Sequence, residues 1–283
     1  MNNRQVQREL RSPREIRKMR TAGLLVWQAH QAAYQIMKPG VTTAELNEAV
    51  ANVFSENNAE PLFLNYPGPT PYPAETCISV NEELVHGIPG PRKIFEGDVV
   101  SLDTGCRIAG WCGDAAYTHT IGEITATQKS LLDVTLATLN LSIDLLATKK
   151  KWSEVATEME AMVHDAGFHV VEEMVGHGIG KNLHEAPSVP NYCSGEFIAT
   201  GDFDLRPGVV IAIEPMVQVG TKELICLEDG WTQIAADKKY AAHFEHTVAI
   251  TNDGPKRLTG PPNEEEMADL PDWLQDKDQW LVW

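Results

Sequence analysis

The chain has 283 residues, of which 43% are hydrophobic and 22% charged, and its formal net charge is −17 at pH 7. This composition is typical of a globular protein, and its acidity excludes general nucleic-acid binding, for which a basic surface is expected. The five cysteines form no CxxC pair and no apolar run approaches the ~18 residues of a membrane span, so neither a disulfide framework nor a membrane protein is indicated. We expect a cytoplasmic protein with no membrane partner and no specific nucleic-acid partner.

The amino-terminal end is a local exception to the acidic charge. Residues 1–20 hold seven basic and two acidic side chains, which gives a local net charge of +5. We expect a basic leader over residues 1–12, and two interpretations of it are open. It is a solvated leader that continues into a helix face, or it is an arm that contacts an anionic partner.

Two helices followed by strands are expected in the first half of the chain. The first helix is bounded by a capping sequence at Ser12–Glu15 and by the stop signal Lys38-Pro39-Gly40. A second capping sequence at Thr42–Glu45 opens a helix that runs to about residue 57. A proline-rich loop over 65–75 follows, and strand-like runs lie near 77–80, 98–103 and 115–121.

The second half of the chain repeats this order. Apolar residues at helical spacing over 132–146 mark one helix, and another begins at Ser153 and ends near Gly167. Strand-like runs lie near 168–173, 209–213, 224–227 and 243–250. The repeated order of two helices and then strands predicts an α+β fold built by internal duplication, although the two halves share little sequence identity.

A glycine-rich stretch in the second half, VGHGIGKNLHEAP at 175–187, places His177 and His184 seven positions apart among three glycines. Each glycine costs about 1 kcal/mol relative to alanine inside a helix, so we expect a loop here and not a helix. The two histidines are either incidental members of a surface turn or functional groups held where backbone can approach closely.

Four carboxylates stand out among the predicted strands. Because successive side chains alternate across a strand, one acidic residue per strand falls among small neighbours, opposite the bulky apolar residues: Asp103, Asp114, Glu214 and Glu245. If they converge, their repulsion must be relieved, since burying unpaired charges is prohibitive. Protonation of several of them would relieve it, and so would two divalent cations, with His177 as the available imidazole ligand. The alternative of four unrelated surface acids at strand ends is equally open.

Six motifs resemble those of the type I methionine aminopeptidases, in the same order and with similar spacing. They are VNEELVHGIP (80–89), SLDTG (101–105), GWCGD (110–114), GHGIG-x3-HEAP (176–187), AIEPM (212–216) and HFEHT (243–247). The resemblance covers residues 13–258 and implies one catalytic domain with the pita-bread fold. That fold has two pseudo-symmetric helix-helix-strand halves, here 13–125 and 126–258, whose curved, mostly antiparallel sheet is covered by helices on its outer face.

The resemblance also implies a metal site. Five residues match the family's metal ligands: Asp103, Asp114, His177, Glu214 and Glu245. Of these, Asp114 and Glu245 match the pair that bridges the two metals. The implied cofactor is two divalent metal ions per chain, with Mn, Fe, Co and Zn as candidates. His86 and His184 match the two histidines that handle the substrate, and Glu214 would act as general base and then acid. A metal-bridging hydroxide is expected to attack the first peptide bond.

The implied activity is removal of the initiator N-terminal methionine from nascent proteins when the next residue is small. The expected partner is a peptide or nascent-chain N-terminus, the basic leader is expected to contact the ribosome, and the chain is expected to be a monomer. Candidates for the pocket of the methionine side chain are Tyr66, Tyr72, Cys77 and Trp231. Two stretches depart from the family pattern: PYPAETC (71–77) replaces the usual aromatic-Pro-Lys-Ser run, and Cys112 stands where histidine is usual.

Related proteins offer alternatives to this activity. Aminopeptidase P and prolidase enzymes share the fold and ligands but usually carry a whole domain before the catalytic one, whereas about a dozen residues precede the first predicted helix here. Type II methionine enzymes carry a long helical insertion, but only 29 residues separate His184 from Glu214. Non-catalytic pita-bread proteins that serve as binding modules have lost ligands, whereas all five ligands and both histidines are present here. No GxSxG motif supports a serine hydrolase.

Residues 259–283 lie beyond the resemblance and form an acidic extension rich in tryptophan. Residues 263–283 carry a net charge of −6 and three of the seven tryptophans of the chain, Trp273, Trp280 and Trp283. Three exposed tryptophans would leave much apolar surface in water, and disordered segments are usually poor in aromatic residues. We therefore expect the extension to dock on an apolar surface, with the basic residues 1–20 of the same or a second subunit as its electrostatic neighbour. The alternative is a disordered acidic tail.

Overall fold

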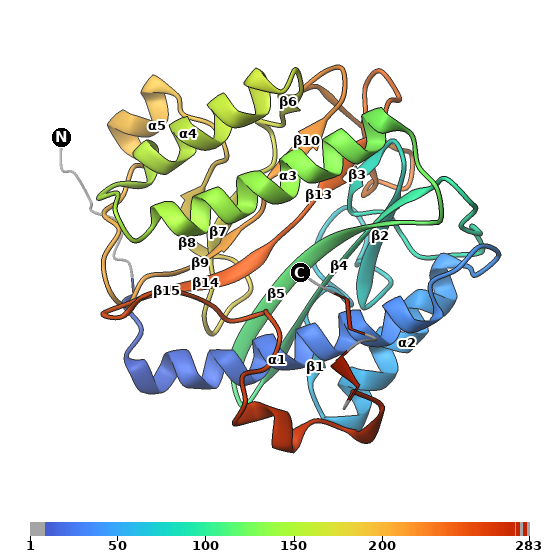
Figure 1. Ribbon diagram of the computed structural model, residues 1–283, viewed down its shortest axis with the longest axis horizontal. Helices are drawn as coiled ribbons and strands as arrows, with labels where there is room; N and C mark the ends of the chain where they lie inside the picture. Colours follow the sequence, from blue (N-terminus) through green and yellow to red (C-terminus); the bar gives the residue numbers. More distant parts are fainter. Residues whose placement is uncertain (1–8, 275, 278–279, 282–283) are drawn as a thin grey trace.

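The computed structural model describes residues 9–274, 276–277 and 280–281 (Figure 1). Its helices are α1 (Pro13–Ile36), α2 (Thr43–Glu56), α3 (Ala126–Leu145), α4 (Trp152–Asp165) and the short α5 (Gly195–Thr200). The four long helices were all predicted. Complete capping boxes open α1 and α2, with Ser12 paired to Glu15 and Thr42 to Glu45. Among the described residues, none of the helices has the length and apolarity that crossing a membrane requires.

The described residues form fifteen strands in total. They are β1 (Glu60–Pro61), β2 (Thr76–Val80), β3 (Glu83–Val85), β4 (Val99–Ile108), β5 (Trp111–Thr120), β6 (His169–Val170), β7 (Gly176–Gly178), β8 (Glu185–Val189), β9 (Val210–Ile213), β10 (Met216–Gln218), β11 (Leu224–Cys226), β12 (Gln233–Ala235), β13 (Ala241–His243), β14 (His246–Thr251) and β15 (Gly254–Arg257). All of their described pairings are antiparallel. The predicted α+β class with mostly antiparallel sheets is confirmed.

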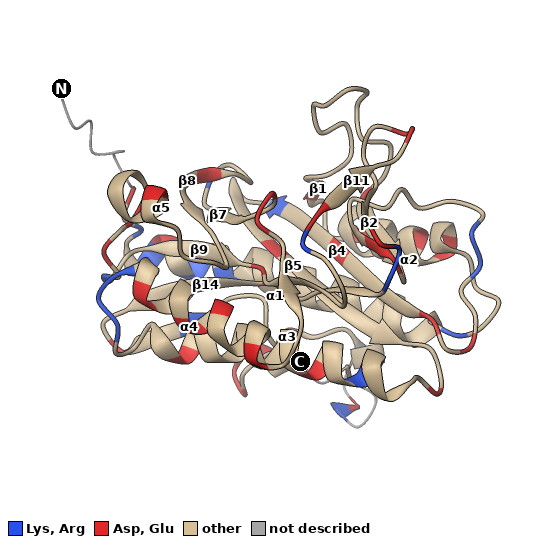
Figure 2. Cartoon of the chain, turned by 90° about the horizontal axis from the view of Figure 1, so that it is seen from above, with Lys and Arg blue, Asp and Glu red and all other residues tan. Residues whose placement is uncertain are grey.

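Two sheets carry most of the architecture, one in each half. The first has the order β1-β4-β2 with β5 paired to β4, and the second has the order β15-β14-β9-β7-β8. Helices α1 and α2 pack on the first sheet, whereas α3 and α4 lie side by side across the second half (Figure 1). In the perpendicular view, α3 and α4 lie along one face while the loops around β1 and β11 project from the other (Figure 2). The open face therefore carries the loops of both halves.

The two halves meet at a seam between β5 and the segment 243–247, and also where β3 pairs with β12. The backbone N–H of Glu245 donates to Ala116 O at 2.8 Å, and Thr118 Oγ1 donates to His243 O at 2.7 Å. Thr247 Oγ1 in turn donates to Asp114 O at 2.9 Å. These bonds bring Asp114 of the first half close to Glu245 of the second half.

The glycine-rich stretch is not a helix, as expected, but it is not a loop throughout. Residues 176–178 form β7, which lies between β9 and β8 in the second sheet. A Cβ at Gly176 would collide with the carbonyl of Ala212 on β9, and a Cβ at Gly178 would collide with the carbonyl of Ala186 on β8. The glycines therefore allow neighbouring backbones to approach closely on both sides of the strand that carries His177.

The carboxy-terminal extension docks on α1, as expected, but not through all of its tryptophans. Trp27 of α1, Leu270 and Leu274 are buried in one cluster, and the Trp280 ring meets the Trp27 ring edge-on with centroids 4.9 Å apart. Trp273 remains 39% exposed, so the expectation is wrong for that residue. Trp283 lies outside the described residues.

The electrostatic neighbour of the extension is one residue of the basic first twenty. Arg20 pairs with Glu266 at 2.7 Å, and its guanidinium also donates to the carbonyls of Leu258, Gly260 and Pro261. The extension thus follows α1 in Figure 1, where it is drawn in dark red below that helix. The basic residues Arg4 and Arg8 of the leader lie outside the described residues.

Candidate active site

A cavity of about 260 Å³ opens beside the seam between the two halves. Every residue predicted for the site lines it: Tyr66, Tyr72, Cys77, His86, Asp103, Asp114, His177, His184, Glu214, Trp231 and Glu245. These side chains come from both sheets and from the loops of the open face. The convergence that strand alternation suggested is therefore present in the fold.

The four carboxylates lie on or directly beside four strands. Asp103 lies on β4 and Asp114 on β5, while Glu214 follows β9 and Glu245 precedes β14. Gly105 faces Asp114 across the β4–β5 pair, and a Cβ there would lie 2.9 Å from Asp114 Oδ1, so glycine makes room for the carboxylate.

Burial makes the charged forms of these carboxylates unfavourable. It raises the pKa of Asp114 to about 7. Burial and then the neighbouring carboxylates raise the pKa of Asp103, Glu214 and Glu245 well above the usual range. Within the described part of the chain, Asp103 Oδ1, Asp114 Oδ1 and Glu245 Oε1 are buried without a hydrogen-bond partner. Such a cluster is unfavourable unless its negative charge is neutralised.

His177 supplies a neutral imidazole next to this cluster. Its Nε2 lies 3.7 Å from Asp114 Oδ2 and 3.6 Å from Glu214 Oε1. Its Nδ1 lies 3.0 Å from Gly178 O, so Nδ1 carries the proton and Nε2 directs its lone pair at the carboxylates. Burial and then His184 lower the pKa of His177 to about 3.

The donor set fits a divalent cation. Ligand atoms of Asp114, His177 and Glu245 all lie within 4.8 Å of one another. Carboxylates with unpartnered oxygens and a backbone-oriented imidazole are the combination that holds Mn, Fe, Co or Zn in proteins. Asp103 and Glu214 line the same cavity outside this group of three.

His86 and His184, which match no metal ligand, both line the cavity. The His184 ring meets the His177 ring edge-on with centroids 4.3 Å apart, and its Nδ1 lies 2.6 Å from the Tyr66 hydroxyl. His86 follows β3 with a φ of 60°, a left-handed conformation that is uncommon for a side chain of this size. Burial and then His184 lower its pKa to about 4, so His86 is neutral at pH 7.

The predicted pocket residues form one continuous wall. The rings of Tyr72 and Trp231 meet edge-on with centroids 5.2 Å apart, and Trp231 Nε1 donates to Thr70 O at 3.1 Å. A Cβ at Gly68 would collide with the Trp231 indole, so the proline-rich loop packs directly on that ring. Cys77 lies on β2 opposite Asp103, which brings this wall to the carboxylate cluster.

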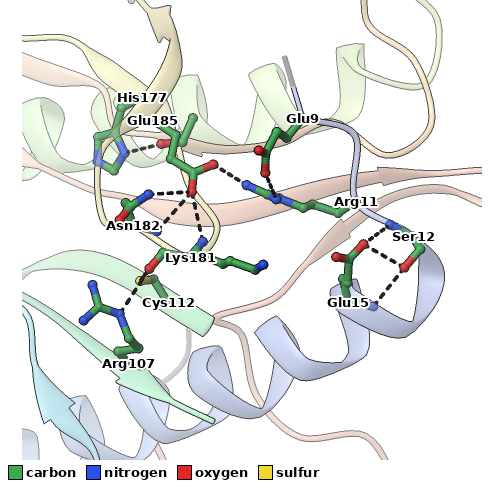
Figure 3. Close-up of polar contacts among 11 residues, drawn as sticks. Glu9, Arg11, Ser12, Glu15, Arg107, Cys112, His177, Lys181, Asn182 and Glu185 are labelled. Carbon is green, nitrogen blue, oxygen red and sulfur yellow. Dashed lines mark hydrogen bonds and ion pairs between the residues drawn. The ribbon is translucent and has the colours of Figure 1, made fainter. Parts of the chain in front are cut away.

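Several lining residues were not found from the sequence. His243 Nε2 lies 3.5 Å from Glu214 Oε2, and burial lowers the pKa of this histidine to about 3. A signal for it existed, because His243 is two positions from Glu245 and strand alternation places both on one face. Six apolar lining residues were not named as candidates either, although Val85, Leu183 and Met216 lie within the motif ranges: Phe63, Val85, Met174, Val175, Leu183 and Met216. Cys112, which departs from the family pattern, is absent from the lining; its Sγ lies 3.4 Å from Lys181 O (Figure 3).

Comparisons with known proteins agree with this arrangement. The model of the metallopeptidase family M24 matches residues 17–252. The chain is 39% identical over 249 residues to methionine aminopeptidase 1 of Bacillus subtilis, covering 88% of this chain and 98% of that protein. It is 40% identical over 255 residues to the methionine aminopeptidase of Aquifex aeolicus, covering 89% of this chain and 98% of that protein.

Solved structures are similar over the same part of the chain. The methionine aminopeptidase of Thermotoga maritima superimposes with a TM-score of 0.83 at 39% identity, covering 89% of this chain and 99% of that one. The prolidase of Pyrococcus furiosus superimposes with a TM-score of 0.68 at 23% identity, covering 90% of this chain and 66% of that one. The latter is a likeness of fold alone.

Proposed function

The chain belongs to the metallopeptidase family M24, and from this premise we propose how its residues remove an N-terminal methionine. It is a methionyl aminopeptidase with the pita-bread fold, as relatives of that name match nearly 90% of the chain and nearly all of their own length. The observation that carries the mechanism is the convergence of four buried carboxylates and His177 on one cavity. The greater similarity to these enzymes than to prolidase favours this activity over an aminopeptidase P or prolidase activity.

Two divalent cations are the cofactor of the proposal, drawn from Mn, Fe, Co and Zn. The residues that would hold them are Asp103, Asp114, His177, Glu214 and Glu245. Support comes from the buried oxygens of this set that lack a partner and from His177 Nε2, which lies 3.7 Å from Asp114 Oδ2 and 3.6 Å from Glu214 Oε1. When bound, two such ions lower the pKa of water to near 7 and polarise a peptide carbonyl.

Proton transfer is assigned to Glu214. Its carboxylate would take a proton from the attacking water and deliver it to the leaving amide nitrogen, as general base and then general acid. Burial favours the protonated form of this carboxyl, which suits a group that must hold a proton between the two steps. His243, 3.5 Å from the carboxylate, is placed to orient it.

Two neutral histidines would handle the substrate. The Tyr66 hydroxyl, bonded to His184 Nδ1, favours the tautomer in which His184 Nε2 carries the proton. That N–H would donate to the scissile carbonyl oxygen as negative charge develops on it. His86, which follows β3 with a left-handed backbone and lines the same cavity, would contribute as well.

The wall of Tyr66, Tyr72, Cys77 and Trp231 is proposed as the pocket of the methionine side chain. Aromatic edges and a thiol suit a flexible thioether, since sulfur contacts aromatic rings favourably. The preference for a small second residue rests on the family membership. Release of the N-terminal residue from Met-Ala-Ser, Met-Leu-Ser and Leu-Ala-Ser peptides tests both points, and we expect only the first peptide to be cleaved efficiently. Equal release of Leu and Met would contradict the pocket.

Further parts of the proposal concern the domains, oligomeric state, location and ribosome contact of the chain. Residues 13–258 form the catalytic domain and 259–283 an extension of it, and the chain acts as a monomer. It works in the cytoplasm, where nascent chains present their N-termini, and the basic leader over residues 1–12 contacts the ribosome. Sedimentation with ribosomes tests the last point, because deletion of residues 2–8, which leaves Arg11 and the Ser12 cap in place, should abolish co-sedimentation while peptide cleavage is kept.

The decisive experiment measures metal content and methionine release on the same sample. We expect metal that is retained on gel filtration and release of Met from Met-Ala-Ser. Retained metal without any turnover would support a non-catalytic binding protein of the same fold. In the His184→Ala variant, metal should stay bound while kcat falls, because a group acting in the transition state is lost.

A further inference from the structure

Arg11 is a buried arginine that precedes α1 and has no role in the proposed chemistry. Its side chain is 4% exposed, although it belongs to the basic first twenty residues. Its backbone N–H donates to Gly208 O at 2.7 Å, two residues before β9, which leads to Glu214. Its guanidinium lies 5.4 Å from the ring centroid of Trp111, the first residue of β5. One residue thus touches two of the elements that lead to the proposed metal ligands.

The guanidinium reaches a third element through Glu185. Arg11 Nη2 donates to Glu185 Oε2, and Nη1 donates to Glu9 (Figure 3). The other oxygen of Glu185 accepts the backbone N–H groups of Lys181 and Asn182, both at 3.0 Å. Glu185 therefore closes the 180–185 turn, which joins β7 to β8. His184 lies in this turn, directly before Glu185.

The 180–185 turn is shaped around the guanidinium. A Cβ at Gly180 would collide with Arg11 Nη2, so a larger residue at this position would displace the guanidinium. From the other side, the backbone N–H of Cys112 donates to Gly180 O at 2.8 Å. The turn is thus held between β5 and the arginine, and a loss of either contact would leave it free to shift.

We propose that Arg11 is a positioning residue, which holds His184 in register with His177 and the carboxylates through Glu185. Arg11 lies outside the lining of the cavity, so it acts on the reaction only by way of the turn. The inference rests on the proposed function, in which His184 donates to the substrate. A displacement of about 1 Å in a group that acts on the transition state lowers the rate by up to about 100-fold.

Matched variants separate positioning from a general loss of charge. Arg11→Met removes the guanidinium, Arg11→Lys keeps the charge without the forked geometry, and Glu185→Gln weakens the partner. Arg206→Met is the control, since Arg206 is an exposed arginine two residues before Gly208. Each is made in the full chain and loaded with Mn²⁺, and each is measured for kcat, KM, metal content and amide hydrogen exchange of the 180–185 turn.

In Arg11→Met we expect kcat to fall about tenfold, while KM and metal content stay within about twofold of the unmodified chain. Exchange of the Lys181 and Asn182 amides should accelerate at least about tenfold, because Glu185 loses the contact that holds its carboxylate. In Arg11→Lys, both kcat and the exchange rate should lie between those of Arg11→Met and those of the unmodified chain. The Arg11→Met/Glu185→Gln double variant should lose no more activity than the more affected single variant, because both act through one contact.

Unchanged kcat and unchanged exchange in Arg11→Met, as in Arg206→Met, would overturn the proposal. Additive losses in the double variant would also overturn it, since the two residues would then act separately. If the unmodified chain releases no methionine, the proposed function fails, and the exchange of Lys181 and Asn182 still decides whether Arg11 holds the turn. A collapse of metal content in Arg11→Met would assign it to the stability of the metal site instead.

Discussion

The hydroxyl of Tyr66 lies 2.6 Å from Nδ1 of His184, across 118 positions of sequence. The contact joins the proline-rich loop of the first half to the last residue before β8 in the second half. It therefore ties a residue predicted for the substrate pocket to a residue predicted for catalysis. A phenol that donates to Nδ1 leaves the proton of a neutral imidazole on Nε2, the nitrogen assigned to the substrate.

Removing this hydroxyl should slow catalysis without removing metal. In Tyr66→Phe, His184 is free to adopt the other tautomer and to rotate, so we expect kcat to fall about tenfold with unchanged metal content. Steady-state kinetics with Met-Ala-Ser and metal analysis check this. Tyr34→Phe is the control, because Tyr34 is an exposed residue of α1. Equal activity of both variants would show that the Tyr66 contact does not orient His184.

Variants of the carboxylates should lose metal and activity together. In Asp103→Asn, Asp114→Asn or Glu245→Gln, one buried anionic ligand becomes a weaker neutral one. We expect metal binding to weaken at least about tenfold, because loss of a residue that only hydrogen-bonds to a metal ligand already weakens metal binding by about that factor. Metal titration and peptide cleavage measure this, with the exposed Asp133→Asn of α3 as control. Full turnover with both metals retained would place the site elsewhere.

Metal removal should lower stability through the same carboxylates. Without cations, ionisation of the buried cluster opposes folding, and a ligand that binds only the folded chain raises its unfolding temperature. We expect a chelator to lower the unfolding temperature at pH 7.5 and added Mn²⁺ to restore it. Thermal unfolding of the same sample before and after chelation is the measurement. An unchanged unfolding temperature would mean that the cluster is not neutralised by metal.

The docked extension should contribute to the stability of α1. Leu274 is fully buried against Trp27, so Leu274→Ala should lower the free energy of unfolding by about 2–5 kcal/mol. Trp273→Ala is the matched control in the same segment, and its effect should be within about 0.5 kcal/mol because Trp273 is 39% exposed. Urea unfolding measures both. Equal stability of the two variants would mean that the extension is not coupled to the core.

Acid should destabilise the protein through buried histidines away from the cavity. Burial lowers the pKa of His30 from 6.5 to about 4, so between these values the unfolded chain binds a proton that the folded chain does not. Stability is therefore lost as pH falls from 6.5 to about 4, by about 3 kcal/mol for this residue. His30→Gln should flatten this part of the stability profile, whereas the exposed His164→Gln should not. Denaturant unfolding from pH 7 to pH 4 is the measurement, and parallel profiles for both variants would contradict the assignment.

Local patterns in the sequence determined the helices and the chemical character of the site. Capping sequences at Ser12–Glu15 and Thr42–Glu45 predicted where α1 and α2 begin, because a cap depends on residues within one turn. Alternation along single strands placed one carboxylate per strand on a face of small residues, because side-chain direction has period two. The motif resemblance then assigned metal and catalytic roles to residues that the fold brings into one cavity.

Only the tertiary structure decided which distant segments meet. The strand character of β7 depends on β8 and β9 closing against Gly176 and Gly178, and glycine carries no strand preference of its own. The contacts of Arg11 with Glu185 and of Trp280 with Trp27 likewise follow from packing across more than a hundred residues. Periodicity reports which face of an element is apolar, but many partners could cover that face. The partner is selected by the free energy of the whole packed chain, which no local pattern contains.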